Sequence, residues 1–244
     1  MKIILLSDIH GNLEALESVC ESVKEEDADK VYCLGDVVGY GADPEACLRM
    51  VDELGWENTF GNHDEAVLNP AGLNLMNPVA RAALEWTREN ISPEGLKWLE
   101  GMKWEVAPFE GAVASHALPL KHGSWLYSDD PNLVRETFAT RPESIIFVGH
   151  LHFAHAWHLK NESEELKLVK VPEEIKLDDG KWLINVGSVG QPRDGDHRAC
   201  YVVYEDAGKT VTYRRIQYDT VTAAKKIVDA GLPEVLAKRL FLGQ

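Results

Sequence analysis

The sequence IILLSDIHGN, at residues 3–12, indicates the fold of this chain. Its four consecutive apolar residues, Ile3 to Leu6, are typical of a short buried strand. Asn12 can cap a helix that begins directly after it. In that helix the apolar residues recur at helical spacing, at Leu13, Leu16, Val19, Cys20 and Val23. A strand followed at once by an amphipathic helix predicts the first unit of an α/β sheet.

The same alternation continues along the chain. Val31 to Leu34 is a second predicted strand, and Trp56 to Phe60 is a third. Between them, Asp43-Pro44-Glu45 combines an N-cap, a proline at the first helical position and an acidic first turn, which predicts a helix from Pro44 to about Leu54. The order β-α-β-α-β favours a sheet with right-handed crossovers.

The second half of the chain is richer in predicted strands. A helical stretch at residues 77–99, with a second start at Ser92-Pro93-Glu94, comes before them. The alternating strands at 201–205 and 211–216 are joined by a predicted hairpin turn at 206–209. A helix is expected from about Thr222, with a break at residues 231–233. The other predicted strands are Ala112–Ser115, Ile145–Val148, Ala154–Leu159, Leu166–Val171 and Trp182–Val186. We expect one domain over residues 1–244, built from two sheets packed face to face with helices outside.

Composition excludes some classes of function. The chain has 25 Lys and Arg against 40 Asp and Glu, a formal charge of -15, and it has no basic run. Such a surface disfavours nucleic-acid binding. Small phosphorylated substrates remain compatible with it, because bound divalent cations can reverse the local field. The apolar N-terminal run is too short for a signal peptide or a membrane span, and the four cysteines form no C-x-x-C pair. We therefore expect reduced thiols, a cytoplasmic location and no membrane partner.

Polar residues follow the predicted strands. Asp8 and His10 come directly after Ile3 to Leu6, and residues two apart in an extended chain point to the same side, so both can reach one cation. Asp36 follows the second strand, after Gly35. Its two oxygens can bridge two cations about 3.5–4 Å apart. Taken alone, each of these motifs also fits an ordinary turn at a strand end.

Three further motifs follow later strands. In Gly61-Asn62-His63-Asp64, Asn62 offers an oxygen ligand, His63 can donate a proton, and Asp64 can fix the tautomer of His63. An Asx-type turn is the alternative, but it does not call for the histidine. His116 ends the strand at 112–115, and a lone histidine is more often structural than a ligand.

The last motif contains His150 and His152, two imidazoles on one side of the chain, which indicates a metal site. Five of the nine histidines fall in these motifs, whereas His155 and His158 are interpreted as structural or surface residues. Strand ends in open α/β sheets are where ligand sites form. The joint occurrence of the motifs therefore predicts a metal centre.

The five motifs, in this order, resemble the calcineurin-like metallophosphoesterase family, whose pattern is D-x-H, G-D, G-N-H-[D/E], a lone His and G-H-x-H. Residues 185–193, NVGSVGQPR, resemble the segment that closes the site in the family's small bacterial and archaeal phosphoesterases. The resemblance implies a four-layer α/β/β/α sandwich of two facing mixed sheets with outer helices. That architecture agrees with the predicted order of strands and helices.

The resemblance also implies a set of ligands and roles. The first metal would be held by Asp8, His10, Asp36 and His152, and the second by Asp36, Asn62, His116 and His150. These donors suit two divalent transition-metal ions, with Mn²⁺ expected ahead of Fe, Zn, Co or Ni. A water shared by the cations would supply hydroxide to attack phosphorus. His63, oriented by Asp64, would then protonate or stabilise the leaving oxygen. Asn62 and Arg193 would bind the phosphate, unless Arg193 pairs with Asp194 or Asp196.

The sequence departs from some relatives in this family. Protein Ser/Thr phosphatases and symmetrical dinucleoside tetraphosphatases carry G-D-x-x-D-R-G, whereas residues 35–41 read GDVVGYG, and Asp64 replaces Glu. Both departures disfavour a protein phosphatase. We predict a phosphodiesterase acting on small phosphate esters. The alternatives are a phosphomonoesterase or Ser/Thr phosphoprotein phosphatase and, after them, a non-catalytic scaffold. Residues 77–100 are either a helical lid or an outer packing pair, and homo-oligomerisation stays open.

Overall fold

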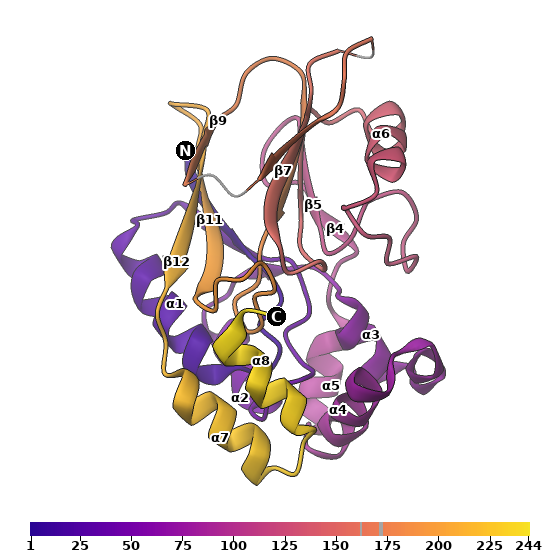
Figure 1. Cartoon of the computed structure of the whole chain (residues 1–244), viewed down its shortest axis with the longest axis vertical. Coiled ribbons are helices and arrows are strands. Elements are labelled where there is room, and N and C mark those ends of the chain that lie inside the picture. The colour runs from indigo at the N-terminus through magenta and orange to yellow at the C-terminus, as the bar shows by residue number, and fades with distance from the viewer. Residues whose placement is uncertain (162, 171–172) are drawn as a thin grey trace.

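The computed structural model describes residues 1–161, 163–170 and 173–244, and within them the strands form two six-stranded sheets (Figure 1). The first sheet has the strand order β3-β2-β1-β11-β12-β9, and the second β4-β5-β6-β10-β7-β8. Strand β1 pairs parallel with β2 and antiparallel with β11. Strand β10 pairs parallel with β6 and antiparallel with β7. Both sheets are therefore mixed, as expected.

The strands are short. Those of the first sheet are β1 (Lys2–Leu6), β2 (Lys30–Cys33), β3 (Glu57–Asn58), β9 (Glu174–Lys176), β11 (Ala199–Glu205) and β12 (Thr210–Ile216). Those of the second are β4 (Glu105–Val106), β5 (Ala112–Ser115), β6 (Ile145–Val148), β7 (Ala154–Leu159), β8 (Lys167–Lys170) and β10 (Lys181–Val186). The described helices are α1 (Leu13–Glu25), α2 (Pro44–Glu53), α3 (Asn62–Leu68), the 3₁₀ helix η1 (Pro70–Leu75), α4 (Pro78–Glu89), α5 (Pro93–Glu100), α6 (Pro131–Thr140), α7 (Thr220–Asp229) and α8 (Glu234–Leu242).

Alternating side chains of the strands separate the core into layers. Ile3 and Leu5 of β1 pack between the sheets with Phe147 of β6 and Ile184 of β10. The opposite face of β1 packs on α1, and the outer face of the second sheet packs on α6, which Figure 1 shows at the right. The order of layers is therefore helix, sheet, sheet, helix. This confirms the predicted four-layer sandwich.

Most predicted elements are present with small changes of boundary. Asn12 caps α1 by accepting the N–H of Ala15 at 3.2 Å, and Ser92 caps α5. Helix α2 begins at Pro44 as predicted, but Asp43 makes no capping bond, because its carboxylate accepts from Lys226 Nζ at 2.8 Å instead. The predicted strand at 56–60 is limited to β3, since the chain turns into α3 at Asn62. Val171, the last residue of another predicted strand, lies outside the described residues.

Five elements were missed by the sequence analysis, one of them the 3₁₀ helix η1. Helix α6 has the same start signal as α2, Asp130-Pro131, and the Asp130 carboxylate accepts the N–H of Asn132 at 2.8 Å. Helix α3 begins inside the third motif, while β4 and β9 are edge strands of two and three residues. Such short strands carry too few residues to display an alternating pattern.

The segment 185–193 brings the two halves of the chain together. The backbone N–H groups of Val189 and Gly190 donate to the carbonyl oxygens of Ser7 and Asp8 at 2.9 and 2.8 Å. Behind this segment, Asp194 forms a largely buried ion pair with Arg215 of β12. The end of β1 is thereby joined to the end of the second sheet. None of the described helices is long and apolar enough to cross a membrane.

Candidate metal centre

The structure brings the predicted ligands together in two buried groups that share Asp36. One contains Asp8, His10, Asp36 and His152, and the other contains Asp36, His116 and His150. In each group, one nitrogen or oxygen from every residue lies within 4.8 Å of the others. Asn62 joins the second group, because its Oδ1 lies 3.2 Å from His116 Nε2. The seven residues come from the five segments that follow strands β1, β2, β3, β5 and β6.

The backbone of these loops is not extended. Asp8, His10, Asp36, His150 and His152 all have left-handed backbones, with φ of 57°, 51°, 51°, 68° and 62°. For residues other than glycine this region is sparsely populated and costs of order 1 kcal/mol or more each. The premise that Asp8 and His10 share an extended chain is therefore wrong, although both side chains do reach one cluster. Strain concentrated in this way is typical of functional sites.

Close backbone contacts hold the loops in place. A Cβ on Gly61 would lie 2.2 Å from the backbone nitrogen of Asp36, and a Cβ on Gly149 would lie 2.0 Å from Ser7 Oγ. Only glycine fits at these two positions. The glycines before Asn62 and before His150 thus allow neighbouring motifs to approach within contact distance.

Backbone carbonyl groups fix the tautomers of the four histidines. The Nδ1 atoms of His10, His116 and His152 lie 3.1, 2.8 and 2.6 Å from the carbonyl oxygens of Val38, Leu34 and Gln191. His150 Nε2 lies 3.1 Å from the Trp125 carbonyl. A carbonyl only accepts, so each of these ring nitrogens carries the proton. The other nitrogen of each ring is left to bind a metal, the arrangement that usually orients histidine ligands.

The first group fits a cation. Burial lowers the pKa values of His10 and His152, so both rings are neutral near pH 7. Their Nε2 atoms nevertheless lie only 3.0 Å apart. Two nitrogen lone pairs at this distance repel each other unless a cation lies between them. Oδ1 of the buried Asp8 has no hydrogen-bond partner among the described residues, which adds a free negative donor to the same place.

The second group contains a charged pair. His116 Nε2 lies 3.3 Å from Asp36 Oδ2. Burial alone would lower the pKa of His116, but the carboxylates of Asp36 and Asp8 and the Leu34 carbonyl together outweigh it and raise that pKa to about 9. Burial lowers the pKa of His150 to about 3, which keeps that ring neutral. A transition-metal ion would take the place of the His116 proton beside Asp36, and the nitrogen and oxygen donors of this group suit such an ion.

Asp64 has a different role from the predicted one. Its carboxylate accepts the backbone N–H groups of Asp36 at 2.7 Å, Val37 at 3.0 Å and Gly61 at 3.1 Å. His63 Nδ1 has no hydrogen-bond partner among the described residues. The prediction that Asp64 orients the His63 ring is therefore corrected. Asp64 instead ties the loop of Asp36 to the loop of Asn62.

His63 lies beside the first group. Its ring packs against His10, with centroids 4.7 Å apart, and against Tyr40 at 4.5 Å. Burial lowers the pKa of His63 to about 4, so the ring is neutral near pH 7. A neutral ring is poorly suited to donate a full proton. It can still donate a hydrogen bond to a developing negative charge.

Comparisons with known proteins agree with this geometry. The sequence model of the calcineurin-like phosphoesterase superfamily domain matches residues 1–208. The chain belongs to the calcineurin-like phosphoesterase superfamily. It is accordingly a metal-dependent phosphoric ester hydrolase.

Individual relatives of this phosphoesterase cover most of its length. An uncharacterised protein of Methanocaldococcus jannaschii is 39% identical over 246 residues, covering 99% of this chain and 98% of the relative. A symmetrical bis(5'-nucleosyl)-tetraphosphatase of Actinobacillus succinogenes is 23% identical over 72% of this chain and 75% of its own. The crystal structure of a metallophosphoesterase from Sphaerobacter thermophilus superposes with a TM-score of 0.87 at 33% identity, covering all of both chains.

Arg193 of the phosphoesterase lies at the edge of the site. Asp194 and Asp196 pair with Arg215 and Arg198, so the alternative in which they bind Arg193 is excluded. The Arg193 guanidinium instead lies over the ring of Tyr40, 5.6 Å from its centroid, and donates to Gln191 Oε1 at 2.7 Å. Its Nε is buried without a partner among the described residues. The guanidinium therefore has donors that no hydrogen bond described here occupies.

The sequence analysis missed Tyr40 as a site residue. Tyr40 stands where the G-D-x-x-D-R-G motif has its arginine, and its ring contacts His10, His63 and Arg193. The one available signal was a large aromatic residue between Gly39 and Gly41 in the second motif. That pattern could not predict the contact with Arg193, because Arg193 lies far away in the sequence.

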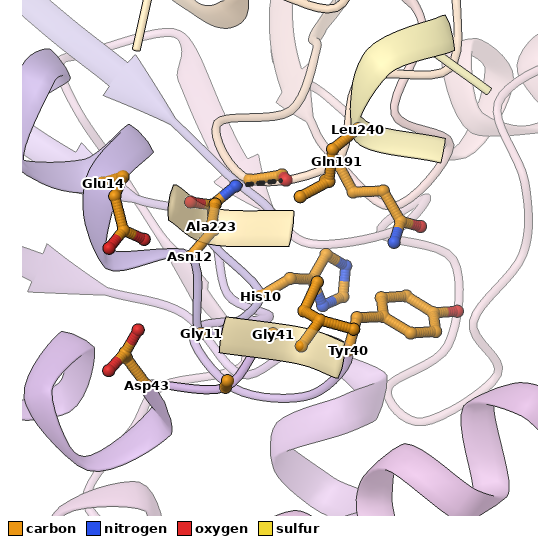
Figure 2. A pocket seen from close by; sticks show the side chains of 13 residues that line it. His10, Gly11, Asn12, Glu14, Tyr40, Gly41, Asp43, Gln191, Ala223 and Leu240 are labelled. Atoms are coloured by element: carbon orange, nitrogen blue, oxygen red, sulfur yellow. Dashed lines mark hydrogen bonds between the residues drawn. The ribbon is translucent and has the colours of Figure 1, made fainter. Parts of the chain in front are cut away.

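A small cavity lies behind His10 in this phosphoesterase (Figure 2). It is lined by Tyr40 and Gln191 together with Ala223 of α7 and Leu240 of α8, and Figure 2 shows Leu240 next to Gln191. The dashed line in the figure is the hydrogen bond from Asn12 Nδ2 to the Gly190 carbonyl, 2.9 Å long. Helices α7 and α8, which follow the matched residues 1–208, therefore close the site on this side.

Proposed function

We propose that this protein is a dinuclear phosphodiesterase that acts on small phosphate esters. The observation that carries the proposal is that Asp36 belongs to both groups of converging donors. One carboxylate with two oxygens is the usual bridge between two catalytic cations. Asp8, His10, Asp36 and His152 would hold the first ion, and Asp36, Asn62, His116 and His150 the second.

Each part of the site has a distinct task in this proposal. The two cations, for which Mn²⁺ is our first expectation, would lower the pKa of a shared water and neutralise phosphate oxygens. Asn62 and Arg193 would hold the phosphate in line for attack. His63 would donate a hydrogen bond to the leaving oxygen as its negative charge develops. The neutral state of the ring favours this role over transfer of a full proton.

Replacing Arg193 is expected to weaken substrate binding. Its replacement by Ala is expected to lower kcat/KM roughly 10- to 100-fold, because a charge-assisted hydrogen bond contributes about 1.5–3 kcal/mol. The loss should come mainly from KM, and Arg193→Lys should restore only part of it. Steady-state kinetics would measure both. Arg198→Ala, which removes an arginine paired with Asp196, is the matched control. A kcat/KM for Arg193→Ala within twofold of the wild-type value would remove Arg193 from the site.

The alternatives predict different substrates. A phosphomonoesterase or protein phosphatase needs cationic groups that bind a dianionic phosphate strongly. Residues 35–41 carry no arginine for this purpose, which disfavours both alternatives. The relative named bis(5'-nucleosyl)-tetraphosphatase supports a small phosphate-ester substrate. A scaffold needs no metal ligands, yet every expected ligand position is filled. The charge of -15 counts against a nuclease.

Two substrates test the proposed function. The Mn²⁺-loaded protein should hydrolyse bis-p-nitrophenyl phosphate with a higher kcat/KM than p-nitrophenyl phosphate. Both release the same chromophore, so one absorbance assay measures both. A preference for the monoester would replace the diesterase with a phosphomonoesterase. No hydrolysis of either ester, with metals bound, would favour the scaffold.

We further propose that residues 1–244 act as one domain in the cytoplasm, consistent with four free, buried cysteines. That residues 77–100 form a lid stays a prediction. Leu84 of α4 and Leu99 of α5 are fully buried in the core, which supports the packing alternative.

A further inference from the structure

Five aromatic rings extend outward from the second group of ligands. Phe60 comes directly before the third motif, and Trp104 lies next to β4. Three more belong to the segment that follows His116: His122, Trp125 and Tyr127. We call these five residues the aromatic strip. None of them is a predicted ligand, and none of the steps described above uses them.

Two rings of the strip touch the ligands directly. Tyr127 stacks on His150, with centroids 4.4 Å apart and planes inclined by 9°. Trp125 packs edge-on against His116, with centroids 5.8 Å apart. The Trp125 carbonyl also fixes the tautomer of His150. The strip therefore begins at the metal centre.

The strip continues away from the centre to the surface. The ring centroid of Trp104 lies 5.8 Å from that of Trp125 and 5.2 Å from that of Phe60. The Trp104 ring also stacks on His122, with centroids 5.3 Å apart. Phe60, Trp104, His122 and Trp125 line a small hollow that is also lined by His116.

Structural packing accounts for only part of the strip. Trp125 anchors its segment by donating from Nε1 to Glu65 of α3 at 3.0 Å. Tyr127, however, is 51% exposed and Trp104 is 37% exposed, and both face solvent beside a catalytic centre. A group of neighbouring aromatic rings that reaches the surface beside such a centre is typical of a ligand-binding or interaction surface. Arg193 and Tyr40 lie by His10 and His63, next to the first group of ligands, whereas the strip adjoins the second.

We propose that the aromatic strip binds a planar aromatic ring carried by the phosphate-ester substrate, as in a nucleotide or an aryl phosphate. The inference rests on the proposed function, because it places the phosphate at the metal centre. Stacking is tolerant of ring identity, since every such ring offers a π-face. The strip would therefore select a class of substrate and not one compound.

Binding of small phosphates tests the proposal without turnover. Isothermal titration calorimetry of the Mn²⁺-loaded protein would compare AMP and phenyl phosphate with ribose 5-phosphate and inorganic phosphate. We expect AMP, phenyl phosphate or both to bind roughly 10-fold tighter than ribose 5-phosphate. Tyr127→Ala and Trp104→Ala should remove most of this ratio, whereas Tyr127→Phe should keep it. Phe241→Ala is the matched control, because Phe241 is also 51% exposed but lies on α8.

Each outcome decides the matter. If only AMP binds more tightly than ribose 5-phosphate, the strip binds a nucleobase. If phenyl phosphate binds more tightly than ribose 5-phosphate, the strip binds an aryl group close to phosphorus. If aromatic and non-aromatic phosphates bind the wild type with equal affinity, the aromatic strip does not bind a ring. This conclusion would hold even if bis-p-nitrophenyl phosphate is hydrolysed. A parallel loss of AMP and ribose 5-phosphate binding in Tyr127→Ala would also overturn the proposal, because the damage would then be to the metal centre. Ring-dependent binding without hydrolysis of any ester would leave the strip standing and refute the proposed function.

Discussion

Replacing Asp36 by Asn is expected to lower kcat on bis-p-nitrophenyl phosphate by about 1,000-fold or more. Asp36 is the only residue shared by the two groups of ligands identified in the described part of the chain. The substitution removes the negative charge and places an NH₂ group where an oxygen would bridge two cations. Several kcal/mol of transition-state stabilisation depend on such a bridge, and each 1.36 kcal/mol corresponds to a tenfold change in rate.

Asn preserves the shape of this position, so the fold should survive. Asp36 Oδ1 accepts the N–H of His63 at 2.8 Å, and the amide oxygen of Asn can do the same. Circular dichroism would check the fold, and mass spectrometry would count bound metal, which should fall by at least one ion per chain. Asp229→Asn, on the exposed side of α7, is the control. Full metal content together with wild-type kcat in Asp36→Asn would contradict the bridging role.

His63→Ala should lower kcat about 100- to 1,000-fold while leaving metal content unchanged. The magnitude is that of removing one preorganised donor from a developing negative charge. His63 contacts the rings of His10 and Tyr40 but belongs to neither group of ligands. The effect should be larger for phenyl esters than for p-nitrophenyl esters, because the poorer leaving group needs more stabilisation.

The comparison of leaving groups separates chemistry from structure. Rates for a matched pair of phenyl and p-nitrophenyl diesters would be measured in wild type and in His63→Ala. His197→Ala, which alters a histidine outside both groups, serves as control. If His63→Ala loses metal, or slows both esters by the same factor, His63 is a structural residue of the centre.

Much of the fold could be predicted from the sequence because its signals are local. The apolar run at Ile3 to Leu6, the Asn12 cap and the proline at residue 44 each determine structure within one turn or strand. The predicted ligands also converge as expected, because strand ends in parallel segments meet at one edge. The family pattern supplied the order of the motifs, and the structure places the predicted ligands in two buried groups.

What could not be predicted depends on contacts between distant segments. The carbonyl partners of the histidines, such as Gln191 for His152, follow from how loops pack and not from any motif. The left-handed backbone at Asp8 and His10 is likewise imposed by neighbouring loops. Asp64 illustrates the limit: its place next to His63 in sequence suggested a partner, whereas its carboxylate faces backbone N–H groups of another loop. The contact between Tyr40 and Arg193 joins residues that no local pattern connects.

Titration of the metal-stripped protein with Mn²⁺, followed by calorimetry and by hydrolysis of bis-p-nitrophenyl phosphate, tests the dinuclear centre most directly. Two ions should bind per chain, and activity should rise only as the second site fills. Because Asp36 serves both groups, the Asp36→Asn variant should bind fewer ions and stay inactive throughout. Full activity at one ion per chain, or activity without added metal, would contradict a centre of two cations bridged by Asp36.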